Sequence, residues 1–274
     1  MFKLAICNEV WGKRPIEEVF AAAAAMGWDG VEIAPFTLAD SVEQIPPDRR
    51  RQIVEAANKT RVRIVGLHWL FVSPPGLHVT TPDPTIRRRT VDYLHALIDF
   101  CGDLGGTVMI FGSPKQRNVE PPNTVEAGRS QLAEALREVG PHCLQRGVTL
   151  CLEALSPQET NLITTVPQAV ELIDEVNHPG IDLMLDVKAM ASMPDGILRT
   201  IRRFGRRAKH VHVNDPNRHA PGMGPEPIDF KPVLAALVEA GFQGWVSCEP
   251  FVYEPDPDTV ARTAIETLRA AMPA

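Results

Sequence analysis

The stretch Val148-Thr149-Leu150-Cys151-Leu152-Glu153 reads as a short, apolar strand that ends in a carboxylate. Three later apolar stretches also end on or next to a polar side chain: 181–186 at Asp186, 209–214 around His212, and 244–249 at Glu249. Packing gives a hydrophobic strand no reason to end in this way. A divalent metal held by carboxylate oxygens and one imidazole supplies such a reason.

Around this stretch the chain alternates strand-like and helix-like segments eight times. The first four strands are expected at 2–7, 30–33, 62–67 and 107–111. The helices are expected at 15–26, 47–60, 84–104, 124–145, 166–176, 194–204, 230–240 and 256–271. Eight such units predict an α/β fold, a single-domain (β/α)8 TIM barrel over residues 1–274. An open doubly wound sheet is the alternative, but no glycine-rich phosphate loop follows the first strand.

The composition predicts a cytoplasmic protein that has no nucleic-acid or membrane partner. The net charge of −6 disfavours nucleic acid, because phosphate binding needs a basic surface. The five cysteines show no CxxC spacing, which fits a reducing compartment. The apolar run at the N-terminus is only as long as a strand, and neither a signal-peptide pattern nor a membrane span is expected.

The alternation of side chains along a strand predicts where the four polar strand ends point. Residues two apart share a face, and counting back from the polar ends gives a mixed set: Thr149, Cys151, Met184, His210 and Ser247. The opposite face is uniformly aliphatic, which suits packing against helices. All four polar side chains are therefore expected to point into the barrel, at the ends of the strands where barrel active sites lie.

Glu153, Asp186, His212 and Glu249 are therefore the predicted ligands of one divalent ion. Three carboxylates at close range repel one another and shift one another's pKa unless a cation compensates them. Oxygen-rich ligands with one imidazole favour Mn²⁺ or Mg²⁺, and Zn²⁺ and Co²⁺ stay open. For any one of these residues alone, an ordinary hydrogen bond at a strand end is the simpler explanation.

Other polar residues near strand ends are candidates for substrate binding. Glu32 lies in the second strand, His68 follows the third, and Glu159 lies just past the fifth. Arg218 lies six residues past His212, and an arginine suits a hydroxyl-rich or phosphorylated substrate. A structural histidine and a surface charge are the simpler alternatives for His68 and Arg218.

Two long loops rich in proline and glycine, 73–84 and 215–227, follow the third and seventh expected strands. Loops at that end of a barrel usually take part in binding. We expect both loops to flank the mouth and to help close it over a substrate.

Together these residues resemble the sugar phosphate isomerase/epimerase family with a xylose-isomerase-like barrel, and within it the D-tagatose and D-psicose 3-epimerases. The resemblance covers essentially the whole chain. It is carried by stretches 31–35, 111–117, 152–155, 159–161, 183–186, 210–215, Arg218 with 221–224, and 244–250.

The resemblance implies that the four predicted ligands bind one catalytic ion, often Mn²⁺, and that the substrate is a sugar or keto-sugar. It implies that Glu153 and Glu249 face opposite sides of the substrate carbon. One removes the proton beside the carbonyl, giving a metal-stabilised enediolate, and the other returns a proton. Glu159 and Arg218 match positions that contact substrate in the epimerases. A homo-oligomer, dimer or tetramer, is compatible with this resemblance.

One position departs from the epimerase pattern. The epimerases carry a histidine three residues after the aspartate ligand, and Ala189 stands there in this chain. Lys188 and His68 are the candidates to replace that substrate contact.

Two other functions remain open at this point. A dehydratase or lyase acting on a keto-sugar or keto-inositol begins with the same proton abstraction, so the ligand set does not separate it from an epimerase. An abasic-site nuclease of the endonuclease IV type needs about three metal ions and more histidine ligands. This chain lacks most of those histidines, and its acidic charge disfavours such a nuclease.

Overall fold

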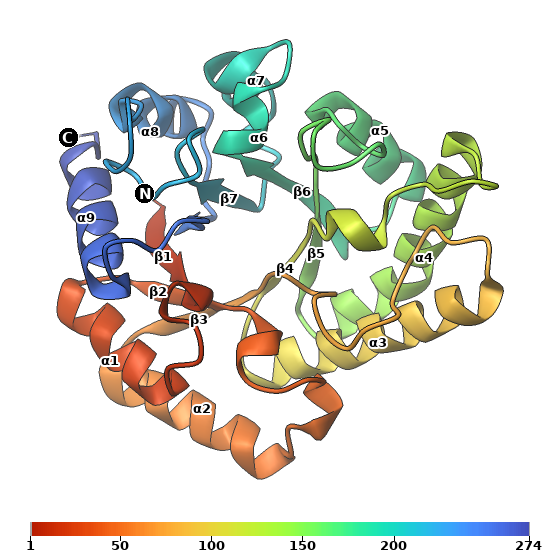
Figure 1. The fold of residues 1–274 in the computed structure, drawn as a ribbon, viewed down its shortest axis with the longest axis horizontal. Helices are drawn as coiled ribbons and strands as arrows, with labels where there is room; N and C mark the ends of the chain where they lie inside the picture. The colour runs from red at the N-terminus through yellow and green to blue at the C-terminus, as the bar shows by residue number, and fades with distance from the viewer. Residues whose placement is uncertain (1, 274) are drawn as a thin grey trace.

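Eight parallel strands close into a barrel in the computed structural model, which describes residues 2–273 (Figure 1). The strands pair in chain order, and the last pairs back with the first. Their bounds are β1 Lys3–Cys7, β2 Gly30–Ile33, β3 Arg63–Leu67, β4 Val108–Phe111, β5 Thr149–Glu153, β6 Ile181–Asp186, β7 His210–Val213 and β8 Trp245–Cys248. The predicted TIM barrel is confirmed.

Helices surround the barrel (Figure 1). Their bounds are α1 Ile16–Met26, α2 Pro47–Thr60, α3 Pro84–Asp103, α4 Val125–Gln145, α5 Val166–Val176, α6 Val187–Ala191, α7 Gly196–Phe204, α8 Phe230–Glu239 and α9 Pro257–Ala270. Short 3-10 turns occupy Asn8–Trp11, Pro35–Thr37, Val42–Gln44 and Pro114–Gln116. Several helices are capped at the N-terminus by a side chain that accepts a backbone N–H of the first turn, as Asp83 does for α3 and Thr124 for α4.

The sequence did not predict α6. Asp186 ends β6, and its side chain accepts the backbone N–H of Ala189, so the chain turns into a short helix directly after the strand. The next helix, α7, begins at Gly196, two residues later than expected.

The predicted alternation of side chains is confirmed. Cys151 and Met184 pack with Ala5, Val108 and other residues in a small cluster inside the barrel. The aliphatic residues of the opposite parity belong to the larger core between strands and helices. Gly66 allows β3 to approach β4, because a Cβ atom there would lie 1.8 Å from the carbonyl oxygen of Val108.

Both long loops lie at the C-terminal ends of the strands, since they connect β3 to α3 and β7 to α8. The backbone N–H of Val79 in the first loop bonds the carbonyl of Gln116 at 2.8 Å. In the second loop, the carbonyl of Arg218 accepts the N–H of Phe251 at 2.9 Å. Within residues 2–273, every helix is too short or too polar to cross a membrane.

Two neighbouring residues of α8 test the helix packing. Leu237 is fully buried, whereas Val238 is 45% exposed. We expect Leu237→Ala to lower the free energy of unfolding by about 2–5 kcal/mol, because it leaves a cavity. Val238→Ala is the matched control and should change it by less than about 0.5 kcal/mol. Denaturant unfolding measures both, and equal effects would contradict this packing.

Candidate active site

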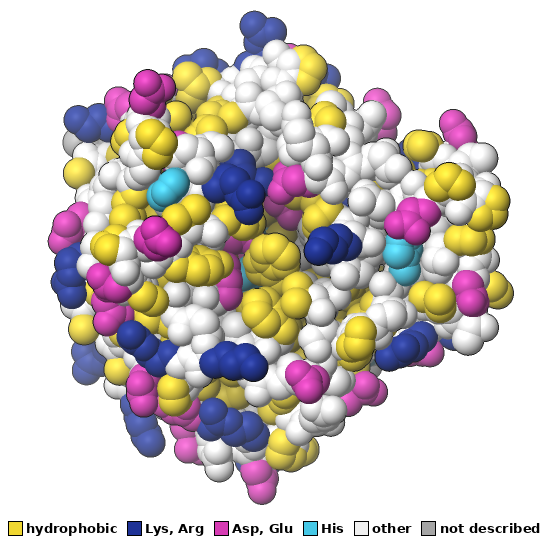
Figure 2. Space-filling view, in the orientation of Figure 1, with side chains coloured by type: hydrophobic (Ala, Val, Ile, Leu, Met, Phe, Trp, Pro, Cys, Tyr) yellow, Lys and Arg dark blue, Asp and Glu magenta, His cyan; other side chains and the backbone are white. Residues whose placement is uncertain are grey.

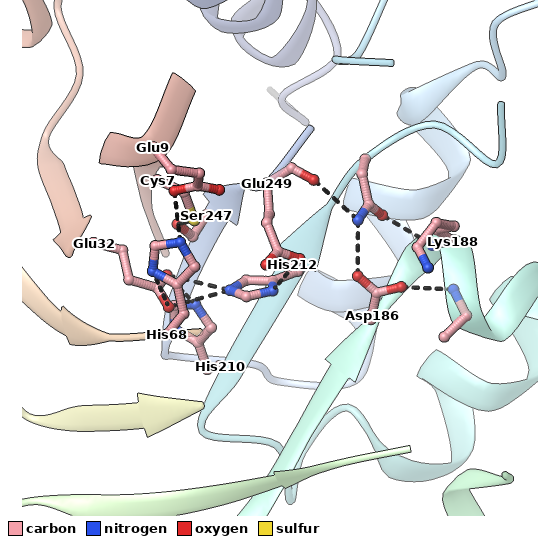
Figure 3. Close-up of polar contacts among 12 residues, drawn as sticks. Cys7, Glu9, Glu32, His68, Asp186, Lys188, His210, His212, Ser247 and Glu249 are labelled. Atoms are coloured by element: carbon pink, nitrogen blue, oxygen red, sulfur yellow. Dashed lines mark hydrogen bonds and ion pairs between the residues drawn. The ribbon is translucent and has the colours of Figure 1, made fainter. Parts of the chain in front are cut away.

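Four ionisable side chains meet where β5 to β8 end. Glu153 and Asp186 are the last residues of β5 and β6, His212 lies in β7, and Glu249 directly follows β8. None of the four is more than 7% exposed. Ligand atoms of Glu153, Asp186 and His212 lie within 4.8 Å of one another. Nδ1 of His212 lies 3.0 Å from Oε2 of Glu249 (Figure 3).

This group fits a divalent cation. Nδ1 of His212 is buried, and its 3.0 Å contact with Oε2 of Glu249 does not have the geometry of a hydrogen bond. Around it stand carboxylate oxygens, which cannot donate to it when ionised. Three carboxylates and one imidazole form the donor set that divalent cations such as Mn²⁺ and Zn²⁺ accept. Glu153, Asp186, His212 and Glu249 are the residues that would hold such an ion.

Glu32 fixes the orientation of His212. Its Oε1 lies 3.2 Å from Nε2 of His212, and its Oε2 lies 2.8 Å from Nε2 of His210. The contact turns Nδ1 of His212 toward the other carboxylates (Figure 3). Glu32 is fully buried and is not among the residues that line the pocket.

Asp186 is oriented by two donors. Its Oδ1 accepts the backbone N–H of Ala189 at 2.6 Å, and its Oδ2 accepts Nδ2 of Asn214 at 2.9 Å. Asn214 also donates to the backbone carbonyl of Glu249 at 3.2 Å. The position that departs from the epimerase pattern, Ala189, therefore still contributes its backbone to the site.

His68 lines the pocket and lies between two carboxylates. Its Nε2 is 2.6 Å from Oε2 of Glu9, and its Nδ1 is 3.7 Å from Oε1 of Glu32. Glu9 is not among the site residues predicted from the sequence. The signal was present, because Glu9 lies two residues past the end of β1, as a polar group close to a strand end.

A pocket opens above these groups at the mouth of the barrel. It is lined by His68, Trp69, Ile110, Gly112, Ser113, Pro114, Glu153, Leu155, Glu159, Lys188, Glu249 and Phe251. Figure 2 shows apolar side chains around this central region, with acidic and histidine atoms between them. A larger groove of about 590 Å³ lies beside α3, lined by Arg88, Arg89 and Asp92 among others. It contains none of the strand-end groups, so we place the active site in the smaller pocket.

The outer part of the pocket carries Lys188 and Glu159, whose Nζ and Oε1 lie 2.6 Å apart. The Lys188 ammonium is 4.9 Å from the centre of the Phe251 ring, and the Arg218 guanidinium is 5.3 Å from it. Burial opposes ionisation of Glu159, but hydrogen bonds from Lys188 and Ser156 hold its pKa below the usual value. No pattern along the strands predicts that Phe251 belongs to the pocket.

Burial and neighbouring charges shift the pKa values of Glu153 and Asp186. Burial, followed by the nearby charges of Asp186 and Glu249, raises the pKa of Glu153 well above its usual value. Burial also raises the pKa of Asp186, although the Lys188 charge opposes this. A cation between these groups would reverse both effects, because it favours the ionised carboxylates.

Comparison with known proteins settles the family. The model of the xylose isomerase-like TIM barrel matches residues 20–271. The chain belongs to this family. The predicted resemblance is confirmed, and the matching relatives identify the chain as an enzyme of the isomerase and epimerase type.

Two relatives and one solved structure illustrate the similarity. The fructoselysine 3-epimerase of Shigella flexneri is 25% identical over 272 residues, which are 94% of each chain. The D-psicose 3-epimerase of Ruminiclostridium cellulolyticum is 30% identical over 181 residues, covering 64% of this chain and 60% of that protein. The crystal structure of D-psicose 3-epimerase with D-tagatose from Clostridium cellulolyticum H10 superposes with a TM-score of 0.86. That comparison covers both chains fully at 22% identity and shows the shared fold.

The contact between Glu32 and His212 predicts an effect on metal affinity. Glu32→Gln keeps the shape but weakens the acceptor that orients the imidazole. We expect the affinity for Mn²⁺ to fall about 10- to 100-fold, as when an outer-shell partner is lost. Calorimetric titration measures this, and thermal unfolding of the metal-free variant controls for damage to the fold. Unchanged affinity would contradict the orienting role.

The raised pKa of Glu153 predicts how the stability of the metal-free protein depends on pH. A carboxyl group whose pKa rises on folding stabilises the protein below its ordinary pKa of 4.5, and that contribution disappears as the pH rises through the folded value. In the presence of a chelator, the wild-type protein should therefore lose stability relative to Glu153→Gln as the pH rises above about 4.5. Thermal unfolding of both proteins measures the difference. A difference that does not change with pH, or that grows in favour of the wild type, would exclude this effect.

Proposed function

We propose that this protein is a divalent-metal-dependent isomerase or epimerase that moves a proton next to the carbonyl of a ketose or ketose phosphate. The convergence of Glu153 and Glu249 on one centre carries the proposal. Their strands flank β6 and β7, which supply Asp186 and His212, so the two carboxylates approach that centre from different sides. The names of the relatives, several of them 3-epimerases of ketoses, support the same chemistry.

Glu153, Asp186, His212 and Glu249 are the proposed ligands, and Mn²⁺ is the proposed ion, with Mg²⁺, Co²⁺ and Zn²⁺ as alternatives. When bound, the ion supplies positive charge that makes the C–H bond beside a carbonyl more acidic. Glu153 and Glu249 act as the proton-transfer pair. One carboxylate removes the proton from one face of the carbon, and the other, in its protonated form, donates a proton to the opposite face.

The outer pocket binds the rest of the substrate in this proposal. Lys188 and Glu159 offer a donor and an acceptor to sugar hydroxyls, and Lys188 replaces the histidine contact that is lost at Ala189. Arg218 lies over the Phe251 ring at the edge of the pocket, where it can reach a hydroxyl or a phosphate. His68 contributes to the lining. We assign Glu32 to orienting His212 instead of to substrate binding.

A second candidate is a dehydratase or lyase on a keto-sugar or keto-inositol, and the position of Lys188 favours it. The ammonium lies in the pocket lining, within hydrogen-bond distance of Glu159. After a carboxylate has removed the proton beside the carbonyl, Lys188 can donate a proton to a hydroxyl on the next carbon. That hydroxyl then leaves as water, and a C=C bond forms.

Deuterium exchange in D₂O tests the proposed function with pairs of 3-epimeric ketoses, beginning with D-fructose and D-psicose. The wild-type protein loaded with Mn²⁺ should incorporate deuterium beside the carbonyl of both epimers of an active pair. Glu153→Gln and Glu249→Gln should each block exchange from a different epimer and lower turnover about 10²- to 10⁴-fold, the usual worth of a positioned acid or base.

Asp186→Asn is the matched control, because Asp186 is a proposed ligand without a proton-transfer role. Its activity should be partly restored by excess Mn²⁺, whereas the glutamine variants should not recover. Release of water with an unsaturated product would instead identify the dehydratase. Wild-type exchange rates in both glutamine variants would rule out the two-carboxylate mechanism.

A further inference from the structure

Arg117 is the bulkiest fully buried side chain among residues 2–273. It lies outside the pocket lining, behind the ends of β4 and β5. Its Nη1 donates to the carbonyl oxygens of Phe111, at 3.2 Å, and of Glu153, at 2.7 Å. Phe111 is the last residue of β4, and Glu153 is the last residue of β5. The guanidinium of Arg117 therefore links the ends of β4 and β5, at the residue whose carboxylate lies in the site, Glu153.

Gly112 leaves space for the carboxylate of Glu153. A Cβ atom at Gly112 would lie 2.1 Å from Oε2 of Glu153, which is closer than non-bonded atoms approach. The missing side chain therefore leaves the space that the carboxylate occupies. Arg117 holds the backbone of Glu153, and Gly112 provides room for its side chain. Both residues belong to the segment that directly follows β4.

We propose that Arg117 is a positioning residue for Glu153. By tying the Glu153 carbonyl to that of Phe111, it sets where the Glu153 carboxylate stands, and it does so without touching the substrate. Glu249, the other carboxylate of the proposed proton-transfer pair, follows β8, and in residues 2–273 no hydrogen bond or ion pair joins it to Arg117. The inference rests on the proposed function, because it assigns to Arg117 an effect on one of the two carboxylates.

The nature of the side chain supports this role. Nε and Nη2 of Arg117 are buried and have no hydrogen-bond partner among residues 2–273, so this guanidinium carries a desolvation cost that two strands already paired along β4 and β5 do not require. The guanidinium of an arginine carries a positive charge at neutral pH. The bonded position at the Glu153 carbonyl places that charge next to the proposed proton-transfer residue.

The test compares two changes at Arg117 with a matched control. Arg117→Met removes the hydrogen bonds and the charge, and Arg117→Lys keeps the charge and can still bond one carbonyl. Arg50→Met is the control, since Arg50 also donates to two backbone carbonyls, 2.9 Å to Ile45 and 3.0 Å to Val42, but neither carbonyl belongs to a residue of the site. Two quantities are measured: Mn²⁺ affinity by titration, and deuterium exchange from each epimer of the most active ketose pair.

We expect Arg117→Met to lower exchange about 10- to 100-fold from the epimer that Glu153→Gln blocks, with a smaller loss from the other epimer. Its affinity for Mn²⁺ should also fall below that of Arg50→Met. Arg117→Lys should recover part of both losses. Gly112→Ala should reproduce the one-sided loss of exchange, because it displaces the same carboxylate. Arg50→Met should keep the wild-type ratio of the two exchange rates.

Equal losses from both epimers, as a general destabilisation gives, would overturn the inference. A wild-type ratio in Arg117→Met would overturn it as well. Failure of the proposed function looks different, since the wild-type protein itself then exchanges no ketose. In that case the Mn²⁺ titration alone tests the positioning role of Arg117. Equal Mn²⁺ affinities of Arg117→Met and Arg50→Met would then refute that role.

Discussion

The repulsion among three buried carboxylates at the barrel mouth is the constraint on which the rest of the site depends. Glu153, Asp186 and Glu249 are almost fully removed from water, and each loses the hydration that would stabilise its charge. Without a cation, burial and the charge of neighbouring carboxylates raise the pKa values of Glu153 and Asp186. The same three carboxylates can bind a divalent cation, because the negative charges that repel one another all attract the ion.

The layer beneath these carboxylates keeps them in place. Carboxylates and imidazoles alternate from Glu9 through His68, Glu32 and His212 to Glu249, with each imidazole between two carboxylates (Figure 3). The contacts are 2.6, 3.7, 3.2 and 3.0 Å in that order. Each ring is hydrogen-bonded to one carboxylate and faces a second, so the site is oriented before any substrate arrives, which is the preorganisation that catalysis needs. The strand ends thus supply the reacting groups, and β1, β2 and β3 supply their support.

The sequence predicted the barrel and the gathering of Glu153, Asp186, His212 and Glu249 because both follow from short-range rules. Side chains alternate along a strand, and parallel strands in a barrel all end on one face. Those rules do not predict how the loops pack. The contacts of Arg117 and Phe251 depend on how segments outside the strands pack, which alternation along a strand does not determine. Glu32 was recognised as a site residue, but its depth below the pocket became visible only in three dimensions.

The central claim is that the four strand-end side chains bind one divalent ion. Anomalous X-ray diffraction from crystals soaked in Mn²⁺ tests it most directly, because the signal locates the ion independently of any assay. We expect one strong peak in contact with carboxylate oxygens of Glu153, Asp186 and Glu249 and with Nδ1 of His212. A peak elsewhere, or a Mn²⁺-soaked crystal without a peak among these four side chains, would contradict it.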